Sequence, residues 1–319
     1  MKLAALFPGQ GSQYVGMAKL LREEFAFTKA IYEEASDALK ADLVKLCNEG
    51  PADALQLTEN AQPCILTTSY AWFQVLRHNL DFVPQAGAGH SLGEYSALLS
   101  AGAMTLSEAV QLVRARGQFM QGAVPKGLGK MAAVIGLADD KVEALCKLAT
   151  EGSSIVVPAN YNAPSQVVIA GHAEAVDRFT QIAAAPPTPD LKARKVMPLN
   201  VSAPFHCPLM KPVTEKLMPN LEKVGWKKVT FPIVHNLDAI LRTDEYVVPL
   251  LRDQIDHPVR WTQCVQTLAK DGVDVYVEMG PGKVLTGLVK RIAENAKLFN
   301  LDSLDDLKAF ETFYKENVR

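Results

Sequence analysis

The stretch GAGHSLGEYSA, from Gly87 to Ala97, places one serine, Ser91, between two glycines and ahead of an apolar segment. Residues 89–93 match the pattern G-x-S-x-G, which predicts a sharp turn from a strand into a helix. Such a turn strains the backbone of the central residue, and side chains at the two flanking positions would clash, so both need glycine. We therefore expect a strand over residues 84–89 and a helix over residues 92–101, with the serine hydroxyl exposed between them.

The pattern around Ser91 allows two interpretations. A serine after a glycine turn can be an ordinary helix N-cap, and a lone G-x-S-x-G is common by chance. Alternatively the hydroxyl is a nucleophile, because the free N–H groups and the dipole of a helix N-terminus stabilise negative charge beside it. The N–H of Leu92 would then be one oxyanion donor, and the turn PGQGSQ at residues 8–13 could supply a second through the N–H of Gln10. The apolar helix and this second glycine-rich turn favour the nucleophile.

A nucleophilic serine needs a neighbouring base, and histidine is the usual one. Three of the six histidines are set aside because of their positions at a helix end, beside the serine or in a separate small domain: His78, His90 and His172. The candidates that remain are His206, His235 and His257. Two prolines bracket His206 and stiffen its backbone, which favours it. The spacing leaves all three open, and each could instead be a structural histidine.

The helix expected over residues 105–121 carries an arginine on its apolar side. At about 100° per residue, Arg116 lies about 30° from the centre of that side, whereas Arg114 lies about 130° from it, in solvent. A guanidinium keeps its proton, and its burial without a partner is costly, so Arg116 needs an anion beside it. A structural carboxylate of the protein and the carboxylate of a bound acid are both possible partners.

Composition excludes several classes of protein. The chain has 319 residues, 48% hydrophobic and 21% charged, which predicts one large or two smaller globular domains. A net charge of −2 gives no basic excess for nucleic acid. No run of about 18 apolar residues predicts a membrane span, and we expect no secretory leader because the first apolar run stops at Phe7. The five cysteines form no C-x-x-C pair, which argues against zinc and against a disulfide framework. We expect a soluble, cytoplasmic monomer.

The order of predicted elements indicates an α/β protein with an insertion. Composition changes at GAVPKGLGK (122–130) and at AAAPPTPD (183–190). Strands predicted at 131–137, 153–160, 165–171 and 194–200, with helices at 139–149 and 173–183, give the order βαββαβ of ferredoxin-like domains. We therefore expect a small domain over residues 128–200. Residues 1–127 and 201–319 would form a discontinuous large α/β domain, with strands at 3–7, 84–89, 231–236 and 273–279 and helices at 17–40, 63–80, 92–101, 105–121, 208–224 and 263–270.

Six blocks, in order along nearly the whole chain, together resemble one family: LFPGQGSQ, GHSLGEYSAL, RARGQFMQ, NYNAPSQVVIAG, SAPFHCPLM and VEMGPGKVLTGLVKR. They look like the malonyl-CoA:acyl-carrier-protein transacylases of bacterial fatty acid synthesis, to which the acyltransferase domains of polyketide synthases are related. The resemblance implies an α/β-hydrolase-like large domain with an inserted ferredoxin-like small domain. It implies an acyltransferase that moves a malonyl group from malonyl-CoA to the phosphopantetheine thiol of acyl carrier protein, through an acyl-serine intermediate and with no metal or cofactor.

The resemblance also assigns roles to residues. It makes Ser91 the acylated nucleophile, His206 the base and Arg116 the clamp for the malonyl carboxylate, and it places the N–H groups of Gln10 and Leu92 at the oxyanion.

Three further positions follow from the same resemblance. The main-chain carbonyl of Gln254 would orient the histidine in place of an aspartate, and Asn162 matches an asparagine near the site. Phe205 would narrow the pocket and favour malonyl over methylmalonyl. The stretch 183–190 is longer than the family pattern suggests and receives no function.

Some alternatives stay open at this level. The same nucleophile would serve a serine thioesterase or esterase, a non-catalytic domain could hold an acyl carrier, and an acyltransferase could belong to a polyketide pathway. An acidic carrier protein could dock on either of two basic groups, Lys283, Lys290 and Arg291 or Lys192, Arg194 and Lys195, although each group could equally be a solvated surface.

Overall fold

The apolar run Leu3–Phe7 forms β1, a central strand of the larger of two sheets. The computed structural model describes residues 1–201, 203–244 and 247–318, so Ser202, the first residue of the block SAPFHCPLM, lies outside the described residues. Side chains of β1 alternate between two apolar clusters, with Leu3, Ala5 and Phe7 in one and Ala4 and Leu6 in the other. Because both faces of the sheet are covered, the strand reads as an unbroken apolar run.

The large sheet has six strands in the order β10-β9-β1-β2-β7-β8. Neighbouring strands in this sheet are parallel, except for β7 and β8, which are antiparallel. The remaining strands are β2 (Ala86–Gly89), β7 (Ile233–Val234), β8 (Leu241–Arg242), β9 (Val275–Met279) and β10 (Lys297–Leu301). Since β1 and β2 are adjacent and parallel, the turn PGQGSQ after β1 and Ser91 after β2 emerge at the same edge of the sheet.

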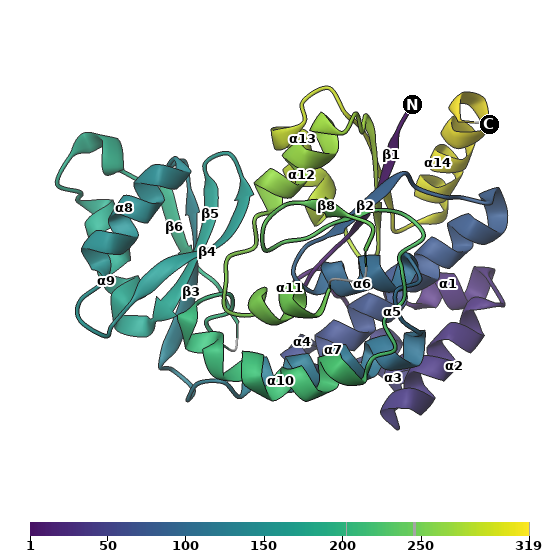
Figure 1. The fold of residues 1–319 in the computed structure, drawn as a ribbon, viewed down its shortest axis with the longest axis horizontal. Coiled ribbons are helices and arrows are strands. Elements are labelled where there is room, and N and C mark those ends of the chain that lie inside the picture. Colours follow the sequence, from purple (N-terminus) through teal and green to yellow (C-terminus); the bar gives the residue numbers. More distant parts are fainter. Residues whose placement is uncertain (202, 245–246, 319) are drawn as a thin grey trace.

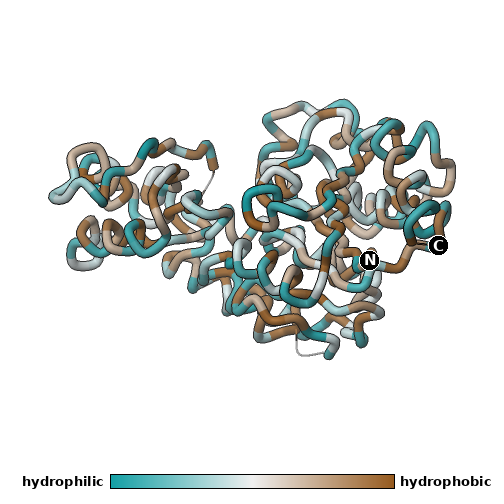
Figure 2. The backbone as a smooth tube through the Cα atoms, turned by 90° about the horizontal axis from the view of Figure 1, so that it is seen from above, coloured by the Kyte–Doolittle hydropathy of each residue, from teal (hydrophilic) through white to brown (hydrophobic). Residues whose placement is uncertain are grey.

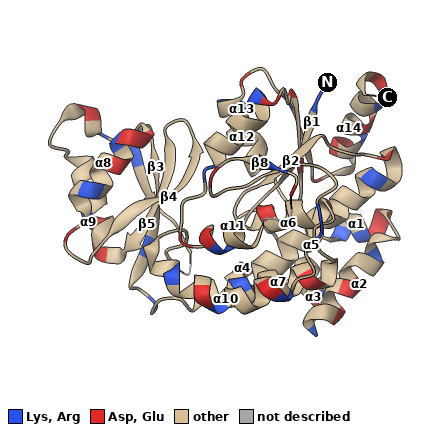
Figure 3. Cartoon of the chain, viewed as in Figure 1, with Lys and Arg blue, Asp and Glu red and all other residues tan. Residues whose placement is uncertain are grey.

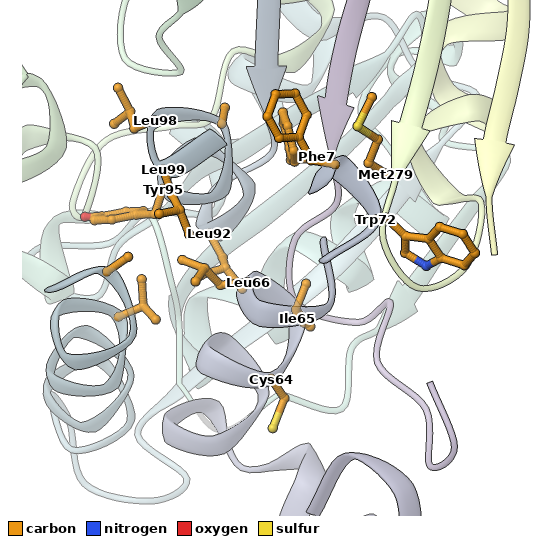
Figure 4. Packing of buried hydrophobic residues seen from close by; sticks show 14 of the residues in the cluster. Phe7, Cys64, Ile65, Leu66, Trp72, Leu92, Tyr95, Leu98, Leu99 and Met279 are labelled. Atoms are coloured by element: carbon orange, nitrogen blue, oxygen red, sulfur yellow. The ribbon is translucent and has the colours of Figure 1, made fainter. Parts of the chain in front are cut away.

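Helices cover both faces of this sheet (Figure 1). One face packs against α5 (Thr58–Leu80), α6 (Leu92–Ser100) and α14 (Leu304–Asn317), and the other against α12 (Trp261–Lys270) and α13 (Val284–Ile292). On the first side, α2 (Thr28–Leu39) and α7 (Leu106–Gln121) pack against α5. Figure 4 shows Ile65 and Leu66 of α5 close to Leu92 of α6 within the first cluster. The other helices of the larger lobe are α1 (Lys19–Glu24), α3 (Leu43–Glu49), α4 (Ala52–Gln56), α10 (Lys211–Lys223) and α11 (Val248–Asp253).

A four-stranded antiparallel sheet forms the smaller lobe, which stands beside the larger one in Figures 1 and 2. Its sheet order is β4-β5-β3-β6, with α8 (Asp139–Ala149) and α9 (Ala173–Ala184) packed on it. The strands are β3 (Gly129–Ile135), β4 (Val156–Ala163), β5 (Gln166–His172) and β6 (Lys195–Pro198). Along the chain the elements follow the predicted order, strand, helix, strand, strand, helix, strand. A parallel-strand sheet beside a separate antiparallel sheet confirms the α/β class.

Several sequence predictions need correction. The helix expected over residues 17–40 is two helices, because α1 ends at Glu24 and α2 begins at Thr28. The Thr28 hydroxyl donates to the carbonyls of Leu21 and Phe25, a side-chain bond that competes with continuous helix. The helix expected from Pro208 begins as a 3₁₀ turn, and α10 starts at Lys211. Besides the 3₁₀ turn Pro189–Leu191, seven elements of the described residues were not predicted: α3, α4, α11, α13, α14, β8 and β10.

Charged side chains lie mainly on the outer helices, with both signs interspersed, while the strands of both sheets carry few (Figure 3). Across the described ranges, no helix is long and apolar enough to cross a lipid bilayer. All five cysteines are buried free thiols.

The turn between β2 and α6 accepts only glycine at its two flanking positions. Ser91, between them, has φ +52° and ψ −104°, a conformation that non-glycine residues rarely adopt. A Cβ added at Gly89 would lie 1.9 Å from the carbonyl carbon of Gly93, and one added at Gly93 would lie 1.9 Å from the carbonyl oxygen of Phe7. Strand, turn and helix therefore pack backbone against backbone, which fixes where Ser91 stands.

We expect Gly93→Ala to destabilise the protein by about 3 kcal/mol, because the new methyl group would overlap backbone that cannot move aside. The matched control is Gly287→Ala in α13, where an added Cβ meets nothing within 4 Å and alanine should stabilise the helix by about 0.5–1 kcal/mol. Urea unfolding of both variants measures the difference. Equal stability of Gly93→Ala and the wild-type protein would contradict the tight packing of this turn.

Candidate active site

A cavity of about 510 Å³ lies between the two lobes, with Ser91 on its wall. The larger lobe contributes the turn at residues 9–13 and Leu285 of α13, and the smaller lobe contributes Met131, Asn162 and Val168. Because both lobes line it, the cavity exists only when they pack together. Across the described ranges, no group of three or more His, Cys, Asp and Glu side chains could hold a metal ion.

The structure brings Ser91 and His206 into direct contact. His206 Nε2 lies 2.7 Å from Ser91 Oγ, and His206 Nδ1 lies 2.8 Å from the main-chain oxygen of Gln254. A carbonyl oxygen only accepts hydrogen bonds, so Nδ1 carries the proton and Nε2 accepts from the serine hydroxyl. The Ser91 side chain makes no N-cap hydrogen bond to α6, which removes the ordinary capping interpretation.

The other two histidine candidates lie elsewhere. His235 is buried with its Nδ1 2.7 Å from Glu94 Oε1. His257 is 55% exposed in its side chain and contacts Asp256. Of the three candidates, packing brings His206 to the Ser91 hydroxyl.

Burial and charge keep the His206 imidazole neutral. Burial is the larger cause and the Arg116 charge the second, and together they lower the pKa of His206 from 6.5 to about 3. The hydrogen bond to the Gln254 carbonyl opposes this shift and is outweighed. The ring is thus available as a proton acceptor throughout the neutral range.

Arg116 lies on the buried side of α7, as the periodicity predicted, with 1% exposure. It donates to Gln62 Oε1 at 3.0 Å, Gln254 Oε1 at 2.9 Å and Ser91 Oγ at 3.1 Å, and its charge lies 5.2 Å from the ring centroid of Tyr95. Among the described residues, no carboxylate forms an ion pair with it. Burial lowers the pKa of this guanidinium, which still cannot lose its proton near neutrality.

The prediction that Arg114 points into solvent is wrong. Arg114 is half-buried and donates to the carbonyl of Glu59 at 2.9 Å and to Asn60. Pro63, inside α5, has no N–H for the Glu59 carbonyl four residues earlier. The Arg114 guanidinium satisfies that carbonyl instead, a role that helix periodicity does not reveal.

Two residues of the cavity wall carry backbone N–H groups that no recorded hydrogen bond of the described residues uses. Gln10 and Leu92 both line the cavity, and within the described residues no hydrogen bond accounts for the N–H of either. The Gln10 side chain donates to Thr58 Oγ1 at 3.1 Å, which ties the turn to α5. Unpaired N–H groups at a helix N-terminus and at an adjacent turn are suited to bind an oxyanion.

The remaining predicted residues also reach the cavity. Asn162 Oδ1 lies 2.8 Å from His90 Nε2, and the His90 ring packs beside Trp261. Phe205 is buried to 8% exposure and lines the cavity next to His206.

Sequence reasoning missed three buried residues that hold the site together. Gln62 accepts from Arg116, and Asn236 Oδ1 accepts from the N–H of Ser91 at 2.7 Å. Glu94 accepts from the backbone N–H of Asn236 and from the side-chain amide of Gln254. Only Glu94 had a local signal, since Ser91-x-x-Glu94 has capping-box spacing. Gln62 and Asn236 come from segments with no motif.

Comparison with known proteins gives a consistent result. A model of the acyl transferase domain matches residues 5–304. The malonyl CoA-acyl carrier protein transacylase of Escherichia coli K12 is 45% identical over 294 residues, covering 92% of this chain and 93% of the relative. An acyl carrier protein S-malonyltransferase from Vibrio cholerae superposes with a TM-score of 0.93 at 41% identity, covering 97% of this chain and 100% of that chain.

A further solved structure is a malonyl-transacylase in complex with its type II PKS acyl-carrier protein. It has a TM-score of 0.93 and 40% identity, and covers 98% of this chain and 100% of that chain. The resemblance carried by six sequence blocks is confirmed. The chain belongs to the acyl transferase domain family, and within it to the malonyl CoA-acyl carrier protein transacylases.

Proposed function

We propose that this enzyme transfers a malonyl group from malonyl-CoA to the phosphopantetheine thiol of acyl carrier protein for fatty acid biosynthesis. The observation that carries the proposal is a serine hydroxyl 2.7 Å from a neutral imidazole and 3.1 Å from a guanidinium with no paired carboxylate among the described residues. The first pair suits acyl transfer, and the guanidinium suits an acyl group that ends in a free acid. The names of the relatives support the same substrate and acceptor.

In the first half-reaction, Ser91 takes the acyl group. His206 Nε2 accepts the hydroxyl proton as Oγ attacks the thioester carbonyl, and the N–H groups of Gln10 and Leu92 would bind the oxyanion. The carbon–sulfur bond then breaks, and the imidazolium returns its proton to the leaving thiolate of coenzyme A. The products are free coenzyme A and a malonyl ester on Ser91.

The second half-reaction reverses the chemistry with another thiol. His206 accepts the proton of the phosphopantetheine thiol, the sulfur attacks the ester carbonyl, and the proton returns to Ser91 Oγ. One thioester is consumed and one is formed, so electrons and protons balance without a redox cofactor. Arg116 would hold the malonyl carboxylate in both half-reactions through its charge.

The carrier would approach along α13. Val284, Leu285 and Leu288 of this helix line the cavity, with exposed Lys283 at its N-cap and exposed Lys290 in its last turn. This position favours the basic group at residues 283–291 over the group at 192–195 as the docking face for an acidic carrier. A second candidate function is malonyl transfer to the carrier protein of a polyketide pathway, since one similar structure is a malonyl-transacylase in complex with a type II PKS acyl-carrier protein.

Domain boundaries at 128 and 200 are part of the proposal, with an α/β-hydrolase-like large domain (1–127 and 201–319) and a ferredoxin-like insertion. Support comes from the sheet order β4-β5-β3-β6, since that order and the sequence of elements match the ferredoxin-like pattern. The strand–turn–helix around Ser91 supports the hydrolase-like assignment. Five buried free thiols suit a reducing, cytoplasmic setting.

Incubation with malonyl-CoA should add one malonyl group to Ser91 and release coenzyme A, measured by intact-protein mass and peptide mapping. Acyl carrier protein with its phosphopantetheine arm should then remove the group and gain its mass. Ser91→Ala is the control and should stay unmodified. Release of malonate at the rate of coenzyme A release, with or without carrier, would identify a thioesterase instead. An unmodified serine with tightly held carrier would indicate a non-catalytic binding domain.

Arg116→Ala should lower the malonyl acylation rate about 100-fold, because a substrate carboxylate buried without its cation loses a charged hydrogen bond. Acetyl-CoA, which lacks that carboxylate, should acylate the variant at least as fast as the wild-type protein. The matched control is Arg114→Ala, which removes an arginine bound to the Glu59 carbonyl and should keep the malonyl-to-acetyl ratio. Equal losses with both donors would argue against a carboxylate clamp at Arg116.

The acylation rate should remain nearly constant from about pH 7.5 down to about pH 5, because an imidazole with a pKa of about 3 stays neutral across this range. An ordinary histidine would lose activity near pH 6.5. In the unfolded state His206 has its ordinary pKa of 6.5, so below that pH the unfolded chain binds a proton that the folded protein does not. The free energy of unfolding therefore decreases below about pH 6.5. Rapid-quench acylation at each pH, with circular dichroism to verify the fold, measures this. A decline centred near pH 6.5 in folded protein would be the contrary result.

A further inference from the structure

A fully buried carboxylate lies directly behind the nucleophile. Glu94, in the first turn of α6, is 0% exposed. Its Oε1 lies 2.7 Å from His235 Nδ1, and its Oε2 accepts from the N–H of Asn236 at 3.0 Å and from Gln254 Nε2 at 2.8 Å. A carboxylate removed from water is stable only with such donors around it. None of these contacts is the capping-box bond to Ser91 N that the spacing predicts, because Asn236 takes that position.

Two residues bound to Glu94 hold the backbone of Ser91 from both sides. Asn236 Oδ1 accepts from the N–H of Ser91 at 2.7 Å, and Gln254 Nε2 donates to the carbonyl of Ser91 at 3.0 Å. Asn236 Nδ2 also donates to the Gly89 carbonyl at 2.8 Å. A non-glycine residue at positive φ, such as Ser91, keeps that strained conformation only when surrounding contacts hold its backbone in place. The Glu94 carboxylate is the shared acceptor that holds Asn236 by its backbone N–H and Gln254 by its side-chain amide.

The carboxylate also faces Arg116 across one amide group. Gln254 Oε1 accepts from Arg116, and Nε2 of the same amide donates to Glu94, so the amide dipole lies between the two charges. A direct ion pair would occupy the Arg116 guanidinium. If there were no anion nearby, the cost of burying its charge would be uncompensated. With the amide between them, Glu94 stabilises the cation at a distance and leaves it free for a second anion.

We propose that Glu94 is a positioning residue that holds Ser91 in its reactive backbone conformation through Asn236 and Gln254, an inference that rests on the proposed acyl transfer. The carboxylate needs both its charge, which balances Arg116, and its length, which reaches two segments at once. Substrate would not touch it, so its loss should change how fast Ser91 reacts and leave the binding of malonyl-CoA nearly unchanged.

The test uses two variants of the full chain, Glu94→Gln, which keeps the shape, and Glu94→Asp, which keeps the charge. Single-turnover acylation by malonyl-CoA should be about 100-fold slower in Glu94→Gln and about 10-fold slower in Glu94→Asp, as expected for a nucleophile displaced by about 1 Å. The concentration of malonyl-CoA that gives half the maximal rate should change less than about 3-fold. Acetyl-CoA should show the same factors, because Ser91 attacks both donors.

The control is Ser96→Ala on the same helix, where the buried hydroxyl has no hydrogen-bond partner within the described residues, and it should react at the wild-type rate. Rates are compared for protein with a wild-type circular dichroism spectrum, and Glu94→Asp provides the test if Glu94→Gln does not fold. Acylation of either folded variant within about 3-fold of wild type overturns the inference, as does a loss confined to malonyl-CoA. Absence of acylation in the wild-type protein would instead refute the proposed function.

Discussion

The hydrogen bond from His206 Nδ1–H to the main-chain carbonyl of Gln254 organises the active site. It fixes the tautomer that accepts from Ser91, and it places the Gln254 side chain between Ser91, Arg116 and Glu94. A serine hydrolase triad has a carboxylate where this chain has a neutral carbonyl. No such negative charge stabilises the protonated His206 ring, so burial and the positive charge of Arg116 lower its pKa. In the proposed acyl transfer, a proton taken from Ser91 would therefore be held weakly, which favours its return to the departing thiolate.

The topology explains why these groups meet. Parallel strands β1, β2 and β7 are neighbours, so the turn at residues 8–13, Ser91 and the pair His235–Asn236 emerge at one edge of the large sheet. The smaller lobe then closes the cavity with β3, β4 and β5. The larger lobe carries Ser91, His206 and Arg116, and the smaller lobe completes the walls with residues such as Met131 and Val168.

Local patterns predicted much of this protein, and the failures have physical causes. The glycines around Ser91, the order of elements in the smaller lobe and the burial of Arg116 follow from backbone sterics and periodicity, which act within a few residues. The break between α1 and α2 was missed because it depends on a Thr28 hydroxyl bond rather than on the apolar pattern. The edge strand β10 was missed because only one side is paired, which weakens its apolar signal.

The sequence by itself determined the strained serine turn, the buried cation and the family to which the chain belongs. Only the tertiary structure decided which histidine contacts Ser91, what surrounds Arg116 and how Glu94 is bound. The reason is distance along the chain: His206 lies 115 residues from Ser91, and Gln254 lies 163 residues from it. Spacing cannot encode contacts of that range. They arise when strands and helices pack their buried faces together and bring the chain segments to one edge of the sheet.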